Sequence, residues 1–262
     1  MAKGFKPASA RRHLALALTL LTCLVLAGCA QSTYAWNWHF LSPFEARGQR
    51  NLAFLLTGFG STVAISLAAS VLSMAVGLVV AMAALSGRRV PVLGARVYVE
   101  VFRSIPILVF ILWVFYGLPI LTGIQLSVIT TGLISVAISD SAFTAEIFRS
   151  GLQSFDKGQS EAARSLGLSQ LRTLRLIVLP QVVRAILPAL GNQFVYVLKM
   201  SSLVSVIGFQ ELTRRANELT LVEYRPLEIY TFLVLEYLVL ILIVSHLVRR
   251  LEGHMRLPGK GI

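Results

Sequence analysis

The sequence predicts an all-helical integral membrane protein. Three observations support this: 56% of the 262 residues are hydrophobic, only 14% are charged, and the mean hydropathy is +0.75. Soluble domains usually have a smaller apolar share and about a quarter of charged residues. The chain has room for about five or six spans of roughly 20 residues and for no large soluble domain besides. One membrane domain is therefore expected.

Apolar runs long enough to cross a bilayer recur along the chain. They are residues 14–30, 53–85, 98–121, 124–147, 180–207 and 229–248. None shows the ten-residue alternation of a membrane barrel strand, so each is expected to be a helix that satisfies its own backbone. The second run is longer than a bilayer requires, which predicts a helix that tilts or projects. Its Gly58, Gly60 and Gly77 favour close helix packing.

The net charge of +12 comes mainly from basic residues that lie beside the apolar runs rather than on a soluble face. With six spans, four basic groups fall on one side of the membrane, which the positive-inside rule makes cytoplasmic. They are Lys3, Lys6, Arg11 and Arg12; Arg88, Arg89 and Arg96; Arg149, Lys157, Arg164, Arg172, Arg175 and Arg184; and Arg249, Arg250, Arg256 and Lys260. The pattern predicts a multi-pass protein with a cytoplasmic C-terminus.

Residues 1–30 form a distinct N-terminal segment, and a linker expected on the outer side follows at 31–51. A basic stretch and an apolar run that ends in LVLAGC match a secretory signal with a lipoprotein-type cleavage site at Cys29. Two outcomes stay open: cleavage followed by lipidation of Cys29, or retention of the run as an anchoring helix. Cys23 and Cys29 both lie in this run and support neither a disulfide framework nor a metal site.

A polar and basic segment, residues 156–180, interrupts the apolar pattern. Good helix formers fill residues 157–166, and Gly167 stands where a glycine commonly ends a helix. Ser169 is placed to cap a second short helix, which is expected to run until Pro180 opens the next span. The segment therefore predicts a helical hairpin on the cytoplasmic face.

Residues in this hairpin resemble the EAA loop of ABC importer permeases. The matching residues are Gly158, Glu161, Ala162, Ala163, Gly167 and Pro180. The resemblance implies a coupling helix that sits in a cleft of a cytoplasmic ATPase subunit and passes its movement to the transmembrane helices. The chain has no G-x-x-x-x-G-K-S/T loop. ATP and Mg²⁺ are therefore expected on a separate partner subunit, and no cofactor is expected in this chain.

The likeness extends over residues 52–250 and resembles polar amino-acid permeases of the histidine, glutamine and glutamate type. It rests on YVEVFRSIPIL at 98–108, SAFTAEIFRSG at 141–151, the loop itself, and LKMSSLVSVIG at 198–208. Departures from the family's usual residues are Phe143, Ser104, Ile105 and Ser201. The resemblance implies the five-helix transmembrane domain of a type I ABC importer. The N-terminal helix or signal-like segment would precede this domain, and a cytoplasmic tail at 251–262 would follow it.

The same resemblance implies an assembly in the bacterial inner membrane. Two ATP-binding subunits, a second permease that is identical or a sister chain, and a periplasmic or lipid-anchored substrate-binding protein would complete it. The chain is expected to be a transport subunit and not an enzyme, working by alternating access. The expected cargo is a polar amino acid, either glutamate or aspartate, or glutamine. The short stretches WNW at 36–38, VFRSIP at 101–106 and RLPG at 256–259 resemble glutamate/aspartate permeases. Another small solute stays open.

Polar side chains inside the apolar runs mark the expected substrate pathway, because an ionised group at bilayer depth costs about 2.5–3.5 kcal/mol on insertion scales. The candidates are Arg103, Pro106, Asp140, Glu146, Lys199, Ser201 and Ser202. Arg103 and Lys199 are the cations expected nearest a substrate carboxylate, with snorkelling or internal pairing as the alternative. Asp140 is expected in a wet, inward-facing position, although its hydroxyl neighbours also suit a polar packing seam. Glu146 is expected either to pair with Arg149 or to line the pathway.

Two further interpretations follow from charged residues. The excursion at 210–228 carries charges of both signs and is expected outside the membrane, as a solvated helix or as a docking surface for the binding protein. A secondary transporter that uses Asp140 and Glu146 as ion sites is a second functional class, although no inverted repeat supports it. An intramembrane enzyme is not supported, because the HExxH and GxSxG motifs are absent from the sequence.

Overall fold

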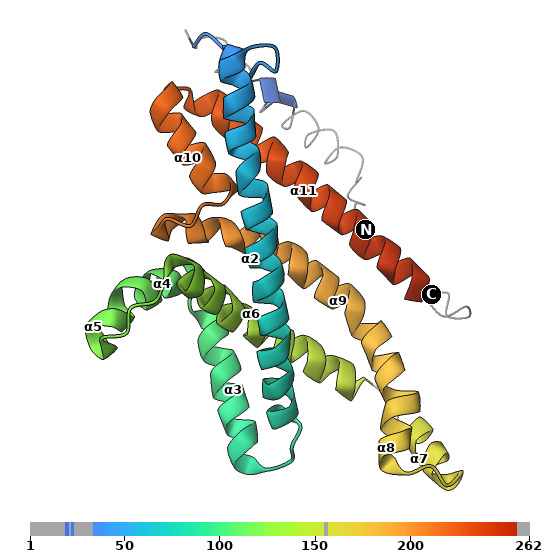
Figure 1. The fold of residues 1–262 in the computed structure, drawn as a ribbon. Coiled ribbons are helices and arrows are strands. Elements are labelled where there is room, and N and C mark those ends of the chain that lie inside the picture. The colour runs from blue at the N-terminus through green and yellow to red at the C-terminus, as the bar shows by residue number, and fades with distance from the viewer. Residues whose placement is uncertain (1–18, 21, 24–33, 155–156, 256–262) are drawn as a thin grey trace, which may run out of the picture. The chain divides into compact units, whose positions relative to one another are not determined.

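The structure is a computed structural model. It describes residues 19–20, 22–23, 34–154 and 157–255. The chain divides into two units, residues 1–38 and 39–262, and the second contains the membrane domain (Figure 1). Every regular element among the described residues is helical. Cys29 and most of the predicted first run lie outside the described residues.

Helix α2, Ala46–Ala84, follows the short 3₁₀ turn η1, His39–Leu41. At 1.5 Å per residue its 39 residues extend about 58 Å, nearly twice the ~30 Å hydrocarbon core of a bilayer. The helix therefore has to tilt or project beyond the membrane, as the length of the apolar run predicts.

The predicted run at 98–121 is divided by a sharp bend. The elements are α3 (Arg89–Ser104), α4 (Ile107–Leu112), the π-helical turn η2 (Trp113–Gly117) and α5 (Leu118–Thr122). The chain turns through 99° between α3 and α4. Pro106 causes the bend, because it has no backbone N–H and disfavours helical geometry at Ile105, which is extended with φ −85° and ψ 124°.

Helix α6, Val128–Gln153, makes the most extensive helix–helix interface of the described chain, and its partner is α2. It begins at Ser127, whose hydroxyl accepts the Thr130 N–H. The interface consists largely of buried Ala, Gly, Ser and Thr. Gly77 of α2 lies so close to α6 that an added Cβ would stand 3.0 Å from the Ser141 carbonyl. Small residues of this kind allow membrane helices to pack closely.

Two short helices and a long span follow. They are α7 (Lys157–Ser165), α8 (Gln170–Thr173), the π-helical turn η3 (Leu174–Val178) and α9 (Leu179–Met200). The expectation that the second short helix stops at Pro180 is wrong, since η3 joins α8 to α9 without a break. Pro180 explains the π turn: it cannot donate to the carbonyl four residues back and would clash with it. The Leu179 N–H instead donates to the Leu174 carbonyl, five residues back.

The last elements complete a five-span domain. Helix α9 continues as the 3₁₀ helix η4 (Ser201–Ile207), and α10 (Leu212–Glu223) and α11 (Pro226–Met255) follow. Within the described residues, four helical stretches are long and apolar enough to cross a membrane, and the bent pair of α3 with α4–α5 makes a fifth. The predicted all-helical membrane fold is confirmed.

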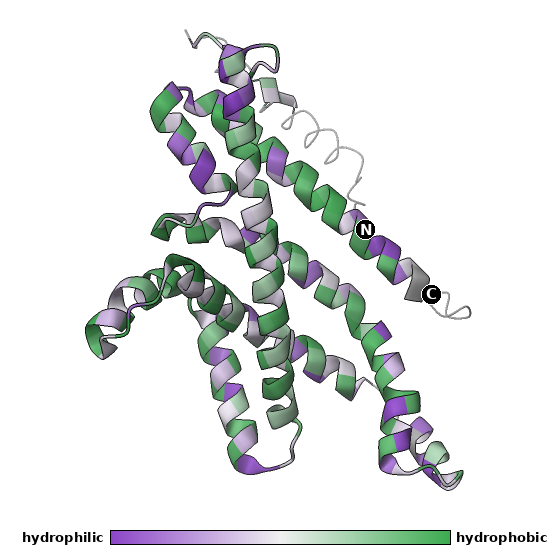
Figure 2. Ribbon diagram, in the orientation of Figure 1, coloured by the Kyte–Doolittle hydropathy of each residue, from purple (hydrophilic) through white to green (hydrophobic). Residues whose placement is uncertain are grey.

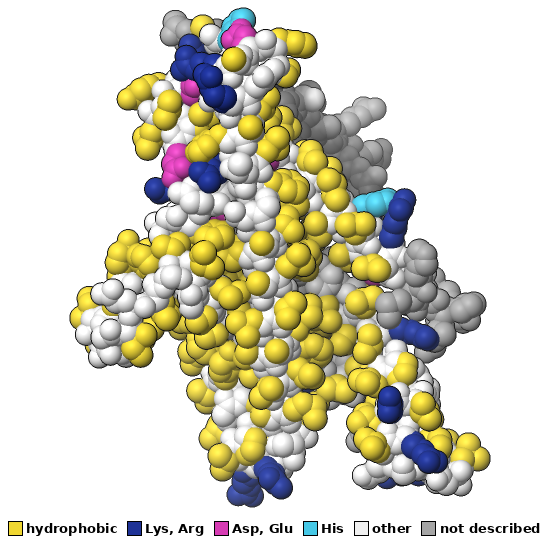
Figure 3. Space-filling model, in the orientation of Figure 1, with side chains coloured by type: hydrophobic (Ala, Val, Ile, Leu, Met, Phe, Trp, Pro, Cys, Tyr) yellow, Lys and Arg dark blue, Asp and Glu magenta, His cyan; other side chains and the backbone are white. Residues whose placement is uncertain are grey.

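The surface agrees with a membrane setting. The largest buried apolar cluster joins α2, α4, α6 and α9 through residues such as Ile65, Ile111 and Val136. Hydrophobic residues predominate along much of the long helices (Figure 2), and many of their apolar side chains are exposed on the face seen in Figure 3. Lys and Arg side chains gather near the ends of the helices, including the α7–α8 hairpin (Figure 3). This distribution suits lipid around the middle and water at both ends.

Candidate functional site

The α7–α8 hairpin contains the residues that match the EAA loop. Helix α7 ends in a Schellman motif, in which Leu168 N–H donates to the Ala163 carbonyl (3.2 Å) and Gly167 N–H donates to the Arg164 carbonyl (2.9 Å). Gly167 has a φ of +80°, a left-handed backbone conformation that is unfavourable for residues with a Cβ atom. The Ser169 hydroxyl then accepts a backbone N–H and caps α8. The predicted helix–glycine–helix hairpin is present.

Most of the hairpin's motif residues lie on its surface. Those that are exposed are Gly158, Glu161, Ala162, Gly167 and Pro180, whereas Ala163 is buried. Gln181 of α9 donates to Gln159 of α7 (2.9 Å), which ties the hairpin to the span. Leu166, Leu171 and Leu176 are also largely exposed. The hairpin therefore presents one carboxylate and several apolar side chains that this chain leaves uncovered.

A cavity of about 770 Å³ lies beside α3, along most of its length, and is closed by the C-terminal ends of α2 and α6. Its charged and polar lining comes from α3 and α6: Arg96, Glu100, Arg103 and Ser104 on α3, and Glu146, Arg149 and Gln153 on α6. We refer to it as the charged cavity. Three Arg and two Glu side chains give this lining a net charge of +1.

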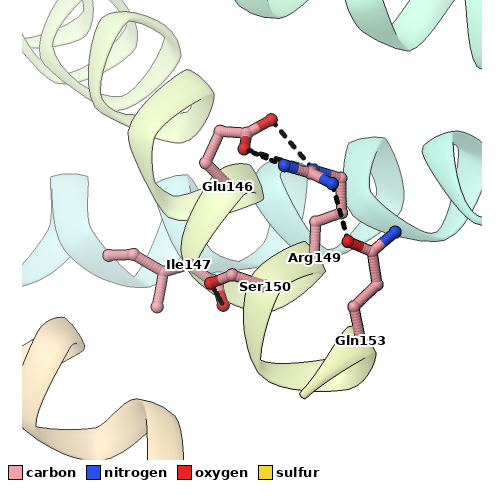
Figure 4. A network of polar contacts seen from close by, with 5 residues as sticks. All are labelled: Glu146, Ile147, Arg149, Ser150 and Gln153. Atoms are coloured by element: carbon pink, nitrogen blue, oxygen red, sulfur yellow. Dashed lines mark hydrogen bonds and ion pairs between the residues drawn. The ribbon is translucent and has the colours of Figure 1, made fainter.

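The α6 wall of the charged cavity is an ordered network (Figure 4). Arg149 donates from Nε to Glu146 Oε1 (3.1 Å) and from Nη2 to Oε2 (2.7 Å), and its Nη1 donates to Gln153 Oε1 (2.7 Å). The pairing predicted from the three-residue spacing is present. Both side chains are about one-third exposed, so the pair contributes at most about 1 kcal/mol to stability. Its main effect is to hold Arg149 in a fixed orientation.

The α3 wall differs, because its charges are not paired with one another. Arg96, Glu100 and Arg103 are spaced i, i+4 and i+7, which places them on one face of the helix. Arg96 and Glu100 form no ion pair with any described residue. The Arg103 guanidinium lies 5.2 Å from the centroid of the Phe143 ring, a cation–π contact worth about 0.5–1 kcal/mol.

A second cavity, of about 450 Å³, surrounds the bend between α3 and α4. Its lining includes Arg103, Ser104, Ile105, Pro106, Phe143 and Tyr196. Arg103 and Ser104 line both cavities. Three of the positions that depart from the family's usual residues, Ser104, Ile105 and Phe143, thus lie together here. We refer to this space as the bend cavity.

Asp140 is buried and not in the wet position that was expected. Its Oδ2 accepts hydrogen bonds from Ser73 Oγ (2.5 Å) and Thr144 Oγ1 (3.2 Å), and its Oδ1 accepts one from Gln193 Nε2 (2.5 Å). These donors come from α2, α6 and α9, so the carboxyl group joins three helices. A buried carboxyl group needs such donors, and only 5% of the residue is exposed. These contacts match the alternative expectation, a polar packing seam between helices. A role of Asp140 in the substrate pathway stays a prediction.

The remaining pathway candidates lie at the junction of α9 and η4. Lys199 is exposed, and its carbonyl accepts the Ser202 hydroxyl (2.7 Å). Ser201 is buried and donates to the Leu198 carbonyl (2.8 Å). None of these three side chains lines the charged cavity or the bend cavity. The structure therefore brings Arg103 together with Pro106 and with Glu146, but not with Lys199.

The excursion at 210–228 is more tightly packed than a solvated helix. The Glu211 carboxylate is fully buried, accepts a backbone N–H in the first turn of α10 (2.8 Å) and accepts the Tyr237 hydroxyl (2.7 Å). Burial raises the pKa of this carboxyl group, against the opposing effect of its hydrogen bonds. Arg47 binds the carboxylate of Glu223 through two hydrogen bonds, of 3.0 and 2.7 Å. These charges join α10 to α2 and α11, so the solvated interpretation is wrong for them.

Sequence reasoning missed several of these groups. It treats Arg96 as an orientation signal only and gives Glu100 no role, although Arg96 and Glu100 precede Arg103 by seven and three residues, which places all three on one helical face. It also missed Glu236, which is buried in α11 with no hydrogen-bond donor to its carboxyl group among the described residues. An isolated Glu in an apolar run carries no local signal of which helix will cover it.

Comparison with known proteins identifies the family. The model of the inner membrane component of binding-protein-dependent transport systems matches residues 73–257. The chain belongs to this family. The permease is 34% identical over 207 residues to the glutamine transport system permease protein GlnP of Escherichia coli strain K12, covering 79% of this chain and 94% of that protein. It is 30% identical over 205 residues to the arginine transport system permease protein ArtQ of Bacillus subtilis, covering 78% and 94%.

Solved structures support the same assignment. A crystal structure of an amino acid ABC transporter with histidines matches with a TM-score of 0.73 and 37% identity, covering 79% of this chain and 96% of that chain. The MetNI methionine ABC transporter in an inward-facing conformation matches with a TM-score of 0.68 at 16% identity, which shows a shared fold. The chain therefore is a membrane-spanning permease subunit of an ABC importer with the type I fold. It is a transport subunit, and such importers also require ATPase and substrate-binding partners.

Proposed function

We propose that the permease moves a polar amino acid across the inner membrane by alternating access, driven by ATP hydrolysis on a separate subunit. The observation that carries this proposal is the α7–α8 hairpin. Its Schellman turn at Gly167 leaves Glu161 and Ala162 exposed, and its second helix continues into α9. A force applied to the hairpin is therefore transmitted directly to a membrane span.

The partner at the hairpin is an ABC ATPase subunit, which holds ATP and Mg²⁺. Exposed Leu166 and Leu171 offer apolar contact area and Glu161 offers a charge, a combination found in protein interfaces. The architecture of the family supports two such ATPases, a second permease that is identical or a sister chain, and a periplasmic or lipid-anchored binding protein. The chain itself holds no cofactor in this scheme.

The orientation of the permease follows from its basic residues. The hairpin and the α2–α3 turn lie at the same end of the domain (Figure 1), and Arg88 and Arg89 belong to that turn. The positive-inside rule makes this end cytoplasmic. The excursion at 210–228 then faces the periplasm, where it offers a docking surface for the binding protein, and the C-terminus is cytoplasmic.

The substrate route passes the charged cavity and the bend cavity. Arg103 lines both, Glu146 lines the first and Pro106 lines the second. The other pathway candidates are Asp140, Lys199, Ser201 and Ser202. Relatives named for glutamine and arginine transport support an amino acid as cargo. Glutamate, aspartate and glutamine are the candidate cargoes. Both fates of residues 1–30 are compatible with this route, including lipidation of Cys29.

Charge reversal at Glu161 tests the coupling site. Glu161→Lys places a cation on the surface that faces the ATPase, so it should abolish transport and docking without disturbing membrane insertion. The measurement is a pull-down of the tagged permease in mild detergent, followed by mass spectrometry of the co-purified proteins. The wild type should recover a protein with a G-x-x-x-x-G-K-S/T loop, and the variant should lose it.

Glu252→Lys is the matched control, because it makes the same charge change near the cytoplasmic end of α11 and outside the hairpin. It should retain the ATPase. Undiminished recovery of the ATPase with Glu161→Lys, together with undiminished transport, would sink the docking assignment.

A further inference from the structure

The charged cavity contains an unbalanced set of charges. On the α6 wall, Glu146 neutralises Arg149 through a two-pronged pair of hydrogen bonds. On the α3 wall, Arg96 and Arg103 face the cavity with Glu100 between them in sequence. None of these three forms an ion pair with another described residue. The α3 wall therefore offers two guanidinium groups and one carboxylate to a ligand.

The order of these groups along α3 is positive, negative, positive. The offset of seven residues separates the Arg96 and Arg103 Cα atoms by about 10 Å along the helix axis, and both side chains are long enough to turn toward a ligand between them. A complementary ligand carries two anionic groups with a cationic group between them. An amino acid with a side-chain carboxylate has this arrangement, since its ammonium group lies between the side-chain carboxylate and the α-carboxylate.

Net charge points to the same class of ligand. The lining carries +1, so a ligand of charge −1 neutralises the cavity, whereas a zwitterion with an uncharged side chain leaves the excess charge in place. Guanidinium groups bind carboxylates through two parallel hydrogen bonds, which are stronger than bonds to a neutral amide. The volume of about 770 Å³ is ample for an amino acid.

We propose that the charged cavity is a binding site for acidic amino acids, with Arg96 and Arg103 binding the two carboxylates and Glu100 binding the ammonium group. The proposal rests on the proposed transport of a polar amino acid and narrows it to a dicarboxylic one. Because the cavity is bounded by the cytoplasmic ends of α2 and α6, the site holds the cargo before its release. Glutamine, whose side chain is neutral, binds there more weakly.

The test measures amino-acid binding to the complex of the permease with its ATPase in phosphatidylcholine nanodiscs, without the binding protein. Radiolabelled L-glutamate, L-aspartate and L-glutamine are the probes. Glutamate and aspartate should bind at least about tenfold more tightly than glutamine, the factor expected for one charge-assisted contact. Arg96→Gln and Arg103→Gln should each remove most of this preference. Glu100→Gln should weaken all three ligands alike, because each carries the same ammonium group.

Arg89→Gln is the control, because Arg89 lies on the same helix and does not line the cavity. It should leave binding of all three probes unchanged. Equal affinity of the wild type for glutamate and glutamine would overturn the inference, as would an Arg96→Gln variant with unchanged preference. A complex that still transports with ATP but shows no preference defeats only this inference. A permease that transports without any ATPase defeats the proposed function instead.

Discussion

At the scale of single residues, Gly167 controls the geometry of the α7–α8 hairpin. It is left-handed at φ +80°, and a Cβ added there would meet no neighbour within 4 Å. The effect of a side chain is therefore confined to the backbone, about 1–2 kcal/mol for a non-glycine residue. We expect Gly167→Ala to lower ATP-dependent uptake and Gly167→Asn to retain more of it, because Asn tolerates this conformation.

Uptake by vesicles that contain each variant checks this expectation. Gly94→Ala is the control, since Gly94 lies inside α3 and also has open space around it. It should leave uptake unchanged. Equal uptake by Gly167→Ala and the wild type would show that the Schellman turn does not limit coupling.

Glu211 gives the folded protein a dependence on pH. Burial raises the pKa of its carboxyl group above 4.5, so the folded state favours the protonated form. The stability that this group contributes is fully present below its unfolded pKa and is lost as the pH rises through the raised folded value. Glu211→Gln stays neutral and should flatten this part of the profile.

Thermal unfolding in detergent at a series of pH values from about 4 to 8 measures the effect of Glu211→Gln. As the pH rises, the Tm of the variant should increase relative to the Tm of the wild type. A constant difference over the whole range would contradict the assigned pKa direction.

At the scale of elements, the approach of α2 to the start of α10 depends on one glycine. A Cβ on Gly58 would lie 2.7 Å from the backbone nitrogen of Leu212, whereas a Cβ on Gly60 would meet nothing within 4 Å. Gly58→Ala should therefore lower stability by about 1–3 kcal/mol, as overpacking usually does. Gly60→Ala, in the same helix, should be neutral or stabilising by up to about 1 kcal/mol.

Thermal unfolding of both variants under one detergent condition checks the pair. A Gly58→Ala variant as stable as Gly60→Ala would mean that α2 and α10 do not pack as closely as described. The sequence alone predicts close helix packing at both glycines, because it does not show which face of α2 contacts α10.

Local signals predicted the elements well where one residue type dictates the backbone. Gly167 and Ser169 marked the hairpin, and the structure places a left-handed turn and a helix cap there. The sequence does not predict that the chain bends by 99° at Pro106 but continues as a helix past Pro180. A proline inside a helical run can break, bend or widen the helix, and tertiary packing decides which of these occurs.

At the scale of the whole molecule, the candidate sites differ in how many of their residues the sequence predicts. The α7–α8 hairpin is contiguous in the sequence, so its six motif residues are recognisable together. The charged cavity combines α3 with α6, which are far apart in the sequence, so the sequence predicts only Arg103 and Glu146 of its lining as pathway residues. The expectation that Asp140 is solvated is wrong, because Ser73 and Gln193 donate hydrogen bonds to its carboxyl group. These donors lie on other helices, and the sequence does not show how those helices pack against α6.

The fold also bears on the choice between functional classes. A secondary transporter would need a self-contained ion site, whereas Asp140 has three hydrogen-bond donors and Glu146 is paired with Arg149. Both acidic residues therefore have structural partners, whereas Glu161 and the leucine side chains of the hairpin are exposed. The energy source of transport is the property that separates the two classes.

The most direct test is uptake by proteoliposomes that contain the permease with its co-purified ATPase and binding protein. Labelled glutamate uptake should require hydrolysable ATP, persist when ionophores collapse all ion gradients, and disappear with Glu161→Lys. Uptake that proceeds without ATP and follows an imposed ion gradient would contradict the assignment of the chain as an ATP-driven importer subunit.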